Sequence, residues 1–292
     1  MKFESIYKRI GNTCLQFINT CLSIIKILLT SKFGLKYDLN LNEKCIILLN
    51  GSSAENYINE KGFTNKGFDF FCVNGFAASE IYPIIKPKRY IILDENMFRY
   101  DFPTYIKIFD NIEKQTNWDM DFFVPQFIKI PTKIIEQLKR NNHIKIVRYN
   151  YVVYKGFQKL GHYFYKKNLA MPKFNNVAGV CLMLSISLNY KKILLLGADH
   201  NWHKNLFVDE KNILYSDPKH FYQEYGLKPL YKDYLDKSKG TFKMHEILYI
   251  FARTFESYHI VNEYSKSLGK SIYNGEQLSF IDAFEKIELE KF

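Results

Sequence analysis

The chain has 292 residues and a formal net charge of +11, from 41 lysine and arginine residues against 30 aspartate and glutamate residues. Hydrophobic residues make up 47% and aromatic residues 17% of the sequence, which excludes an intrinsically disordered chain. This length predicts one large domain with extensions. The basic charge suits an anionic partner such as a nucleotide or a membrane surface, and it equally suits a lysine-rich soluble surface. No motif for nucleic-acid binding occurs, so no nucleic-acid partner is expected.

The cysteines give an indication of the cellular compartment. There are five of them, an odd number, and no two form a CxxC pair. They lie at Cys14, Cys21, Cys45, Cys72 and Cys181. In apolar runs cysteine behaves as a small hydrophobic residue. The pattern therefore predicts a reducing, cytoplasmic compartment and no disulfide framework.

Residues 1–33 form the first predicted unit, an amphipathic helix. Apolar side chains recur there at spacings of three and four residues, at Ile10, Cys14, Phe17, Cys21, Ile24 and Leu28. Polar residues interrupt the apolar stretch and no small-residue cleavage site follows, which argues against a signal peptide and a spanning helix. Two interpretations stay open: the helix packs on the domain, or it lies on the inner face of a membrane.

A polar linker, residues 34–43, leads to a single domain over residues 44–292. Apolar runs of strand length occur at residues 45–49, 70–73, 90–94, 144–147 and 193–196, with helical patterns between them, most clearly at 176–189. Strands that alternate with helices predict an α/β, Rossmann-like fold, a mostly parallel sheet flanked by helices. Ligands of such sheets bind beyond the carboxyl ends of the strands. The polar strand ends should therefore converge: Asn50-Gly51, Asn74-Gly75, Asp94-Glu95-Asn96 and Asp199-His200.

The C-terminal third begins with residues 201–241, which have little periodicity and are expected to form a long irregular insertion, a lid. A long helix is predicted over 242–267, with Gly269 as its stop. Residues 270–274 are typical of a final short strand. Residues 279–292 are expected to form a terminal helix, with Ser279 and Asp282 as capping candidates.

Two strand ends carry candidate ligand-binding groups. The turn Asn50-Gly51-Ser52-Ser53 offers backbone N–H groups, hydroxyls and a close backbone approach at Gly51, which would suit a phosphate or a ribose. An ordinary strand-to-helix turn with a serine cap would have the same sequence. Asn74 supplies an amide that can read a base or sugar edge, because it both donates and accepts.

Two patterns raise the question of a metal. Asp119-Met120-Asp121 matches the DxD pattern of many sugar-nucleotide enzymes, but it precedes an apolar run instead of ending one. Asp199, His200 and His203 have spacings that could bind a metal, although no fourth ligand is evident. The histidines could equally serve as neutral or cationic partners of a departing phosphate. We therefore expect no metal cofactor.

Three segments resemble the bacterial sialyltransferases of glycosyltransferase family 42. They are "CIILLNGSSAENY", similar to the opening strand with its Asn-Gly-Pro-Ser turn, "FDFFCVNGF", and "AGVCLMLSISLNYKKILLLGAD". The resemblance is remote and spans about residues 45–210. It implies a single Rossmann-like nucleotide-binding domain with a flexible lid. It also implies a CMP-activated sugar as donor, inversion at the anomeric carbon and no metal.

The resemblance also assigns roles to positions. Asn50, Gly51 and Ser53 would hold the nucleotide phosphate and ribose, and Asn74 would contact the nucleotide or sugar. The other predicted binding positions are Ser52, Asp94, Asn96, Ala178, Gly179, His200 and Asn201; Asn96 or Asp94 would lie by the ribose or sugar, and Ala178-Gly179 would present backbone to the sugar carboxylate. Departures from the family occur at Ser52, where the family has proline, at Ala178, where it has serine, and at Asn201 and Leu206, where it has tyrosines.

The general base is the last residue that the resemblance implies. The family uses a histidine in the lid segment just before a long helix, and the candidates here are His203, His220 and His245. His245 begins the predicted helix at 242–267 and is the preferred base, since an imidazole titrates near neutrality. Asp199 is the reserve, and His203 would serve the phosphate instead.

These observations predict an inverting glycosyltransferase. It would transfer a sialic-acid-like sugar from a CMP-sugar to a cell-surface glycan such as a lipooligosaccharide or capsule, with a homo-oligomer left open. Two alternatives stay open. One is a Mg²⁺-dependent enzyme like the pterin pyrophosphokinases, which would need Asp94, Asp119 and Asp199. The other is a non-catalytic nucleotide-sugar-binding protein, to which the changes at Ala178 and Leu206 would fit.

Overall fold

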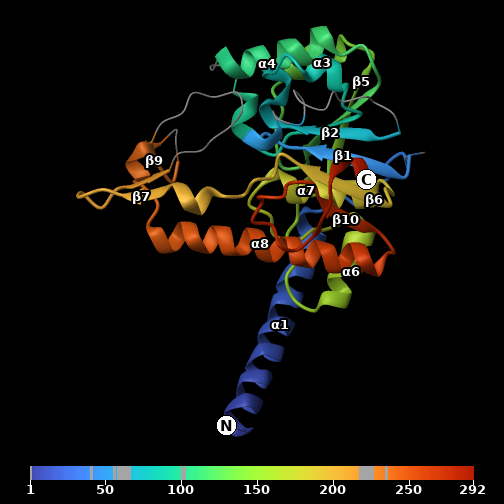
Figure 1. Ribbon diagram of the computed structural model, residues 1–292. Coiled ribbons are helices and arrows are strands. Elements are labelled where there is room, and N and C mark those ends of the chain that lie inside the picture. The colour runs from blue at the N-terminus through green and yellow to red at the C-terminus, as the bar shows by residue number, and fades with distance from the viewer. Residues whose placement is uncertain are drawn as a thin grey trace.

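The structure is a computed structural model, which describes residues 2–39, 42–54, 57, 67–99, 103–216, 227–233 and 236–292. A parallel sheet forms the centre of the molecule. Eight strands lie in the order β11-β10-β6-β1-β2-β3-β4-β5, and every pair of neighbours is parallel (Figure 1). The strands are β1 Lys44–Leu48, β2 Asp69–Val73, β3 Arg89–Ile91, β4 Met120–Pro125, β5 Ile144–Tyr149, β6 Lys192–Leu196, β10 Ser271–Asn274 and β11 Glu285–Lys286. The predicted α/β, Rossmann-like fold is confirmed.

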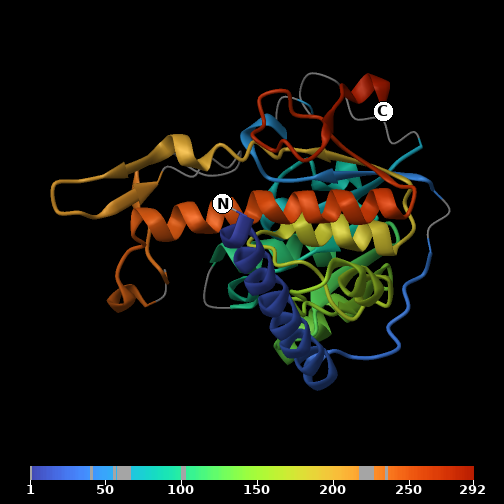
Figure 2. The ribbon, with the colours of Figure 1, turned by 90° about the horizontal axis from the view of Figure 1, so that it is seen from below.

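Helices cover both faces of this sheet, so the central strands are buried on both sides, whereas the edge strand β11 is exposed and β5 is mostly half-buried. Ile46 and Leu48 of β1 belong to the core beneath α3, α4 and α5, whereas Cys45 and Ile47 belong to the core beneath α7 and α8. Figure 2 shows α7 and α8 side by side on their face. The helices are α1 Lys2–Thr30, α3 Tyr82–Ile85, α4 Pro103–Gln115, α5 Thr132–Lys139, α6 Gln158–Lys166, α7 Val177–Ser187 and α8 Met244–Ser267. Burial on both faces explains why the strands are continuous apolar runs.

The strand order reverses at β1. The chain runs from β1 outward through β2, β3, β4 and β5, then returns to place β6 on the other side of β1. Leu48 and Leu196 are paired in register at the ends of these two strands. Such a reversal opens a crevice beyond the carboxyl ends, where ligands of doubly wound sheets bind.

Helix α1 projects from the layer of α7 and α8 and carries the N-terminus far from the sheet (Figure 1). Among the side chains described for this helix, residues 9–30, those buried against the domain lie in the C-terminal half: Thr20, Ser23 and Ile27. The predicted apolar stripe does not pack there, because Ile10, Phe17 and Leu28 are all exposed. Arg9–Thr30 is long and apolar enough to cross a membrane by length and composition, with a mean hydropathy of 1.5.

Three predictions about elements were wrong. Strand β4 was missed, because Asp121 interrupts an apolar run that is otherwise buried. The insertion over 201–241 is not irregular in its described part: β7 Leu206–Val208, β8 Leu214–Ser216 and β9 Lys228–Pro229 form an antiparallel sheet. Residues 279–292 form β11 and the short 3-10 helix Leu289–Lys291 instead of a helix. Tertiary contacts override helix propensity there, since Ile281 and Phe284 are buried in the core.

Candidate functional site

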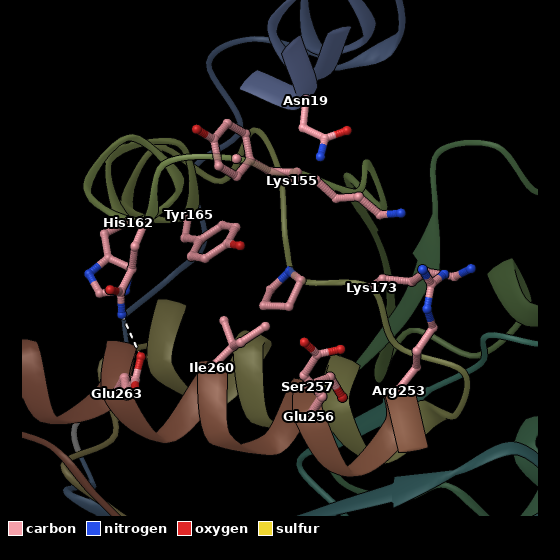
Figure 3. Close-up of a pocket in the computed structure, with 14 residues that line it drawn as sticks. Asn19, Lys155, His162, Tyr165, Lys173, Arg253, Glu256, Ser257, Ile260 and Glu263 are labelled. Atoms are coloured by element: carbon pink, nitrogen blue, oxygen red, sulfur yellow. Dashed lines mark hydrogen bonds between the residues drawn. The ribbon is translucent and has the colours of Figure 1, made fainter. Parts of the chain in front are cut away.

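A cavity of about 240 Å³ lies beyond the carboxyl ends of β1, β2 and β6. Its lining includes Asn50 and Gly51 after β1, Asn74 after β2, and Asp199 and His200 after β6. Three of the predicted strand ends therefore do converge. We call this space the strand-end cavity. A second and larger cavity, of about 410 Å³, lies between α1, α6 and α8 and is called the α1 cavity (Figure 3).

Two glycines let β1 and β6 meet closely at the floor of the strand-end cavity. The N–H of Gly51 donates to the carbonyl of Gly197 over 3.0 Å. A Cβ at residue 51 would lie 2.3 Å from that carbonyl oxygen and 2.8 Å from Asp199 Oδ2. Gly197 has a φ of +69°, and a Cβ there would lie 2.5 Å from the carbonyl oxygen of Leu49. Both positions therefore require glycine for backbone packing, whatever the cavity binds.

Two other residues at the rim have a left-handed backbone conformation, which residues other than glycine rarely adopt. Asn74 has a φ of 46° and His200 a φ of 49°. The hydroxyl of Tyr90 donates to the carbonyl of Asn74 over 2.5 Å, which helps to hold that conformation. Such a backbone conformation persists only where the surrounding structure stabilises it, and residues of this kind cluster at ligand sites.

His200 is neutral and fixed in orientation. Burial lowers the pKa of His200 to about 3. Tyr258 Oη lies 2.6 Å from His200 Nε2, and Asn176 Nδ2 lies 3.2 Å from the same nitrogen. Because both neighbours can donate, Nε2 accepts and the ring proton is on Nδ1. His200 can thus orient a ligand by hydrogen bonding, but it supplies no positive charge at neutral pH.

The N-terminus of α7 supplies positive potential to the cavity instead. Asn176 caps this helix, since its Oδ1 accepts from the N–H of Gly179 over 3.3 Å. Val177 and Ala178, in the first turn, line the cavity. No lysine or arginine is among the described residues that line it. Helix N-termini attract anions through free N–H groups and the helix dipole, so a phosphate would be favoured here.

Gly179 and the serine pair lie behind this lining. A Cβ at Gly179 would lie 1.9 Å from the ring of Phe174, so packing explains this glycine, and its N–H is already used by the cap. Ser52 Oγ donates to Asp199 Oδ2 over 3.2 Å, and the N–H of Ser53 lies 3.4 Å from the same oxygen. The serines therefore position Asp199.

A second carboxylate, which the sequence analysis missed, lies beside Asp199. Glu276 is buried and accepts from the N–H of Gly197 over 2.6 Å. Burial raises the pKa of Glu276, the Gly197 N–H opposes that rise, and the charge of Asp199 adds to it. Glu276 follows β10, which pairs with β6, so the strand-end argument extended to residues 270–274 would have found it.

Other missed residues carry weaker signals. Asn176 stands directly before an apolar helical pattern, which is a recognised capping position. Tyr258 lies in the middle of α8. Trp202 lies in the 3-10 helix Trp202–Asn205, and its ring centroid is 4.2 Å from that of His200. Nothing in the sequence distinguishes these two aromatic residues from core residues.

The predicted base candidates are not brought to the strand-end cavity. His245 is exposed in the first turn of α8 and lies about 20 Å along that helix from Tyr258. His203 is exposed, with its ring centroid 4.5 Å from that of Phe280. His220 lies outside the described residues. Asp199 is the predicted catalytic residue that does line the cavity.

Asp94 and Asn96 lie at the next strand end, after β3, but outside the cavity lining. Asp94 is exposed and caps the 3-10 helix Glu95–Phe98, where its Oδ1 accepts from the backbone N–H of Asn96 over 2.9 Å. The side chain of Asn96 donates to the same oxygen over 3.0 Å. In contrast, Asn201 lines the cavity.

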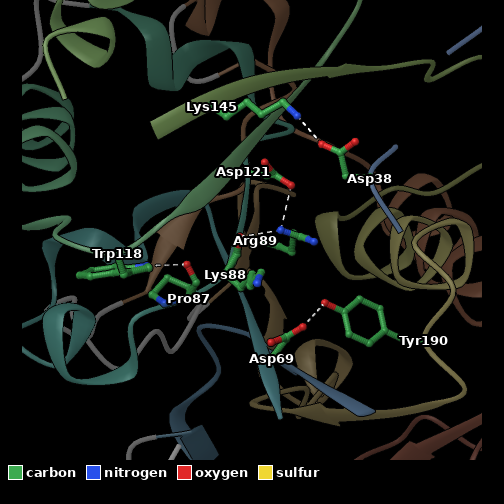
Figure 4. A network of polar contacts seen from close by, with 9 residues as sticks. All are labelled: Asp38, Asp69, Pro87, Lys88, Arg89, Trp118, Asp121, Lys145 and Tyr190. Atoms are coloured by element: carbon green, nitrogen blue, oxygen red, sulfur yellow. Dashed lines mark hydrogen bonds and ion pairs between the residues drawn. The ribbon is translucent and has the colours of Figure 1, made fainter. Parts of the chain in front are cut away.

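The DxD motif lies at the opposite, amino edge of the sheet, away from the strand-end cavity. Asp121, near the start of β4, forms an ion pair of 2.8 Å with Arg89 (Figure 4). Burial raises the pKa of Asp121, while the charge of Arg89 opposes that rise. Asp119 pairs with His143 at 2.9 Å on the surface. In the described part of the chain, no group of three or more His, Cys, Asp or Glu side chains has an arrangement suited to a metal.

Comparisons with known proteins yield a remote structural likeness. No protein-family profile and no curated protein sequence matches the chain. Among solved structures, the chain is similar to the monofunctional alpha-2,3-sialyltransferase Cst-I of Campylobacter jejuni, with 14% identity and a TM-score of 0.41. The match covers 87% of this chain and 84% of that chain. An identity and a TM-score this low carry no conclusion about donor, acceptor or mechanism.

Proposed function

We propose that this protein is a glycosyltransferase whose strand-end cavity binds a nucleotide-activated sugar. The supporting observation is that Asn50, Gly51, Asn74 and Asp199 meet the N-terminus of α7 around one cavity at the reversal of strand order. The more specific donor, a CMP-linked sialic-acid-like sugar, rests on the sequence resemblance to family 42, whose motif segments contain these same residues. The acceptor would be a cell-surface glycan such as a lipooligosaccharide or capsule.

The proposed reaction is an inverting transfer. The acceptor oxygen forms a bond to the anomeric carbon while the bond from that carbon to the CMP phosphate oxygen breaks, and its electron pair leaves with the phosphate. Asp199 takes the proton of the acceptor hydroxyl, a role for which we prefer it to His245 because Asp199 lines the cavity. The N-terminus of α7 stabilises the charge on the departing phosphate.

The cellular setting is part of the same proposal. A reducing interior fits the described cysteines, all of which are free. A glycan acceptor under assembly would be met at the inner face of the membrane, where the enzyme would be peripheral. We propose that catalysis needs no metal, and the experiment below includes Mg²⁺ as a variable.

A panel of nucleotides tests the donor class. CMP, CDP, UDP, GDP and ATP are added separately, with and without Mg²⁺, and thermal unfolding is followed. We expect a cytidine nucleotide to stabilise the protein without metal, by about 2.7 kcal/mol at a hundredfold excess over its Kd. Stabilisation by ATP with Mg²⁺ alone would replace the proposal by the pyrophosphokinase-like alternative, and stabilisation by none would contradict a nucleotide site.

A matched pair of variants localises the binding. Asn74 and Asn212 both have left-handed backbone, with φ of 46° and 58°, but Asn212 lies in the turn between β7 and β8, away from the cavity. In Asn74→Asp a new negative charge would repel the phosphate, so the CMP-dependent stabilisation should disappear. It should persist in Asn212→Asp. Equal behaviour of the two variants would place the nucleotide elsewhere.

A further inference from the structure

Helix α1 packs on the domain with its polar side and leaves its apolar side exposed, the reverse of the usual arrangement in a soluble protein. Its inward side is mainly polar: Ser23 Oγ accepts from the N–H of Lys155 over 2.9 Å, and Thr20 Oγ1 accepts from the N–H of Phe157 over 3.0 Å. The outward side is a continuous apolar half-cylinder, in which every member is at least 53% exposed: Ile10, Leu15, Phe17, Ile18, Leu22, Ile25, Leu28 and Leu29. An apolar surface of this extent marks an interaction site.

The geometry of α1 favours insertion into one leaflet over a complete crossing. Residues 9–18 are all exposed and extend about 15 Å beyond the contact with the domain. The hydrocarbon core of a bilayer is about 30 Å thick. The rest of the apolar segment is held against the domain by Thr20, Ser23 and Ile27, so a full crossing would drag the domain into the hydrocarbon.

The α1 cavity opens directly beside this half-cylinder. Asn19 of α1 lies on one side of it, the face of α8 that carries Arg253, Ser257 and Ile260 lies on another, and the segment around Lys155 closes it (Figure 3). Its volume of about 410 Å³ is in the range of small-molecule sites.

Positive charges gather at one end of the α1 cavity. The side chains of Lys155, Lys173 and Arg253 all line it and lie together on one side in Figure 3. Burial lowers the pKa of Lys173, and the charges of Arg253, Lys155 and Lys26 lower it further. Among the ion pairs of the described residues, none involves any of these four cations. The three cations outnumber the two carboxylates that line the cavity, Glu256 and Glu263, and this excess of positive charge favours an anion from outside the chain.

The other end of the cavity has a different character. Glu263 accepts there from Gln158 Nε2 over 2.5 Å, whereas Glu256 lies between the two ends, one helical turn from Arg253 (Figure 3). Hydroxyl or amine groups of a ligand would find acceptors there, while a phosphate would go to the cationic end.

We propose that the α1 cavity binds the phosphate-bearing headgroup of an anionic phospholipid, while the apolar half-cylinder of α1 inserts into the same leaflet. Lys155, Lys173 and Arg253 bind the phosphate, and the carboxylate end receives the polar part of the headgroup. The two surfaces complement one leaflet, because the first matches its charge and the second its hydrocarbon. This assignment does not depend on the sugar-transfer proposal.

The test compares vesicle binding of the full chain and two double variants. Flotation is measured at physiological salt with vesicles of phosphatidylcholine alone and of phosphatidylcholine mixed with phosphatidylglycerol. Lys173→Gln/Arg253→Gln removes two charges from the cavity. Lys159→Gln/Lys166→Gln removes the same charge from exposed positions of α6 that do not line it. Thermal unfolding of each variant confirms that it is folded.

We expect the cavity variant to lose at least about tenfold in binding to the phosphatidylglycerol vesicles, from about fivefold per membrane-facing charge. The α6 variant should lose less than about threefold. Equal losses would show a general electrostatic attraction and overturn the site, as would no loss in either. Inorganic phosphate is titrated in parallel by ³¹P NMR. Phosphate binding that needs Lys173 and Arg253, without any preference between the vesicles, would assign the cavity to a soluble ligand and overturn the lipid assignment.

Discussion

The strand-end cavity and the α1 cavity lie next to each other but are built on opposite principles. Pro172 and Lys173 line the α1 cavity, and only a few residues later Asn176 and Val177 line the strand-end cavity. The strand-end cavity is formed by backbone turns and has no described lysine or arginine in its lining. The α1 cavity is formed by long charged side chains from three separate segments.

This difference suggests different tolerances to change. Backbone turns such as that at Gly51 fix ligand atoms in place, and a single added methyl group disturbs them. Long cationic side chains such as Lys173 adapt to their ligand, and each contributes a modest share of the attraction. The strand-end cavity should therefore respond sharply to small substitutions, and the α1 cavity gradually to the loss of charge.

The largest expected effect is a loss of stability at acid pH, caused by the buried His200 of the strand-end cavity. The pKa of this histidine is about 3 in the folded protein, against an ordinary value of about 6.5, because the ring is buried. Between these two values the unfolded chain binds a proton that the folded chain does not bind. The free energy of unfolding should therefore fall as the pH falls from about 6.5, by about 1.4 kcal/mol per pH unit from this residue.

Urea unfolding at a series of pH values, in the parent and in His200→Gln, isolates that contribution. The glutamine keeps an acceptor for Tyr258 but cannot titrate. The difference in unfolding free energy between the two proteins should shrink or reverse as the pH falls. A constant difference across the series would contradict a neutral, buried His200.

Gly51→Ala should have the next largest effect. The added Cβ would lie 2.3 Å from the carbonyl oxygen of Gly197, and backbone must move to relieve this contact. We expect a loss of about 1–3 kcal/mol in stability and the disappearance of the CMP-dependent stabilisation. Gly11→Ala is the control, because a Cβ there meets nothing within 4 Å. Normal CMP binding by Gly51→Ala would show that the turn is not part of the site.

The fold could be predicted from the sequence wherever local pattern and burial agree. The runs that became β1, β2 and β6 are apolar throughout, because both faces of a parallel sheet are covered. Strand β4 was missed because Asp121 is tolerated by its pairing with Arg89, a contact between distant segments. The terminal segment was mistaken for a helix because its partners, such as the carbonyl of Ala198 that accepts from Ser279, are equally distant in sequence.

Contacts between segments distant in sequence also limited what could be predicted of the candidate site. Polar residues directly after strands, such as Asn50, Asn74 and Asp199, could be predicted from the sequence to lie close together, because parallel strands end at one edge of the sheet. Tyr258 contacts His200 from a helix, so no argument from strand ends could find it. The orientation of α1 was open for a further reason: periodicity locates an apolar face but does not state what covers it.

The smallest expected effect separates the two cavities. Ser23 Oγ accepts from the N–H of Lys155 and donates to its carbonyl, both at 2.9 Å, and so fastens α1 to the segment that closes the α1 cavity. Ser23→Ala should lower the free energy of unfolding by about 1 kcal/mol and accelerate amide hydrogen exchange around Lys155. Thr13→Ala, in the exposed half of α1, should change neither, because among the described residues Thr13 Oγ1 bonds only to the carbonyl of Arg9 in its own helix. The CMP-dependent stabilisation should be the same in both variants, since the strand-end cavity is held by the sheet and not by α1. If Ser23→Ala weakened CMP binding as well, the two cavities would be energetically coupled through residues 172–177, and occupancy of the membrane-facing site would then regulate the other.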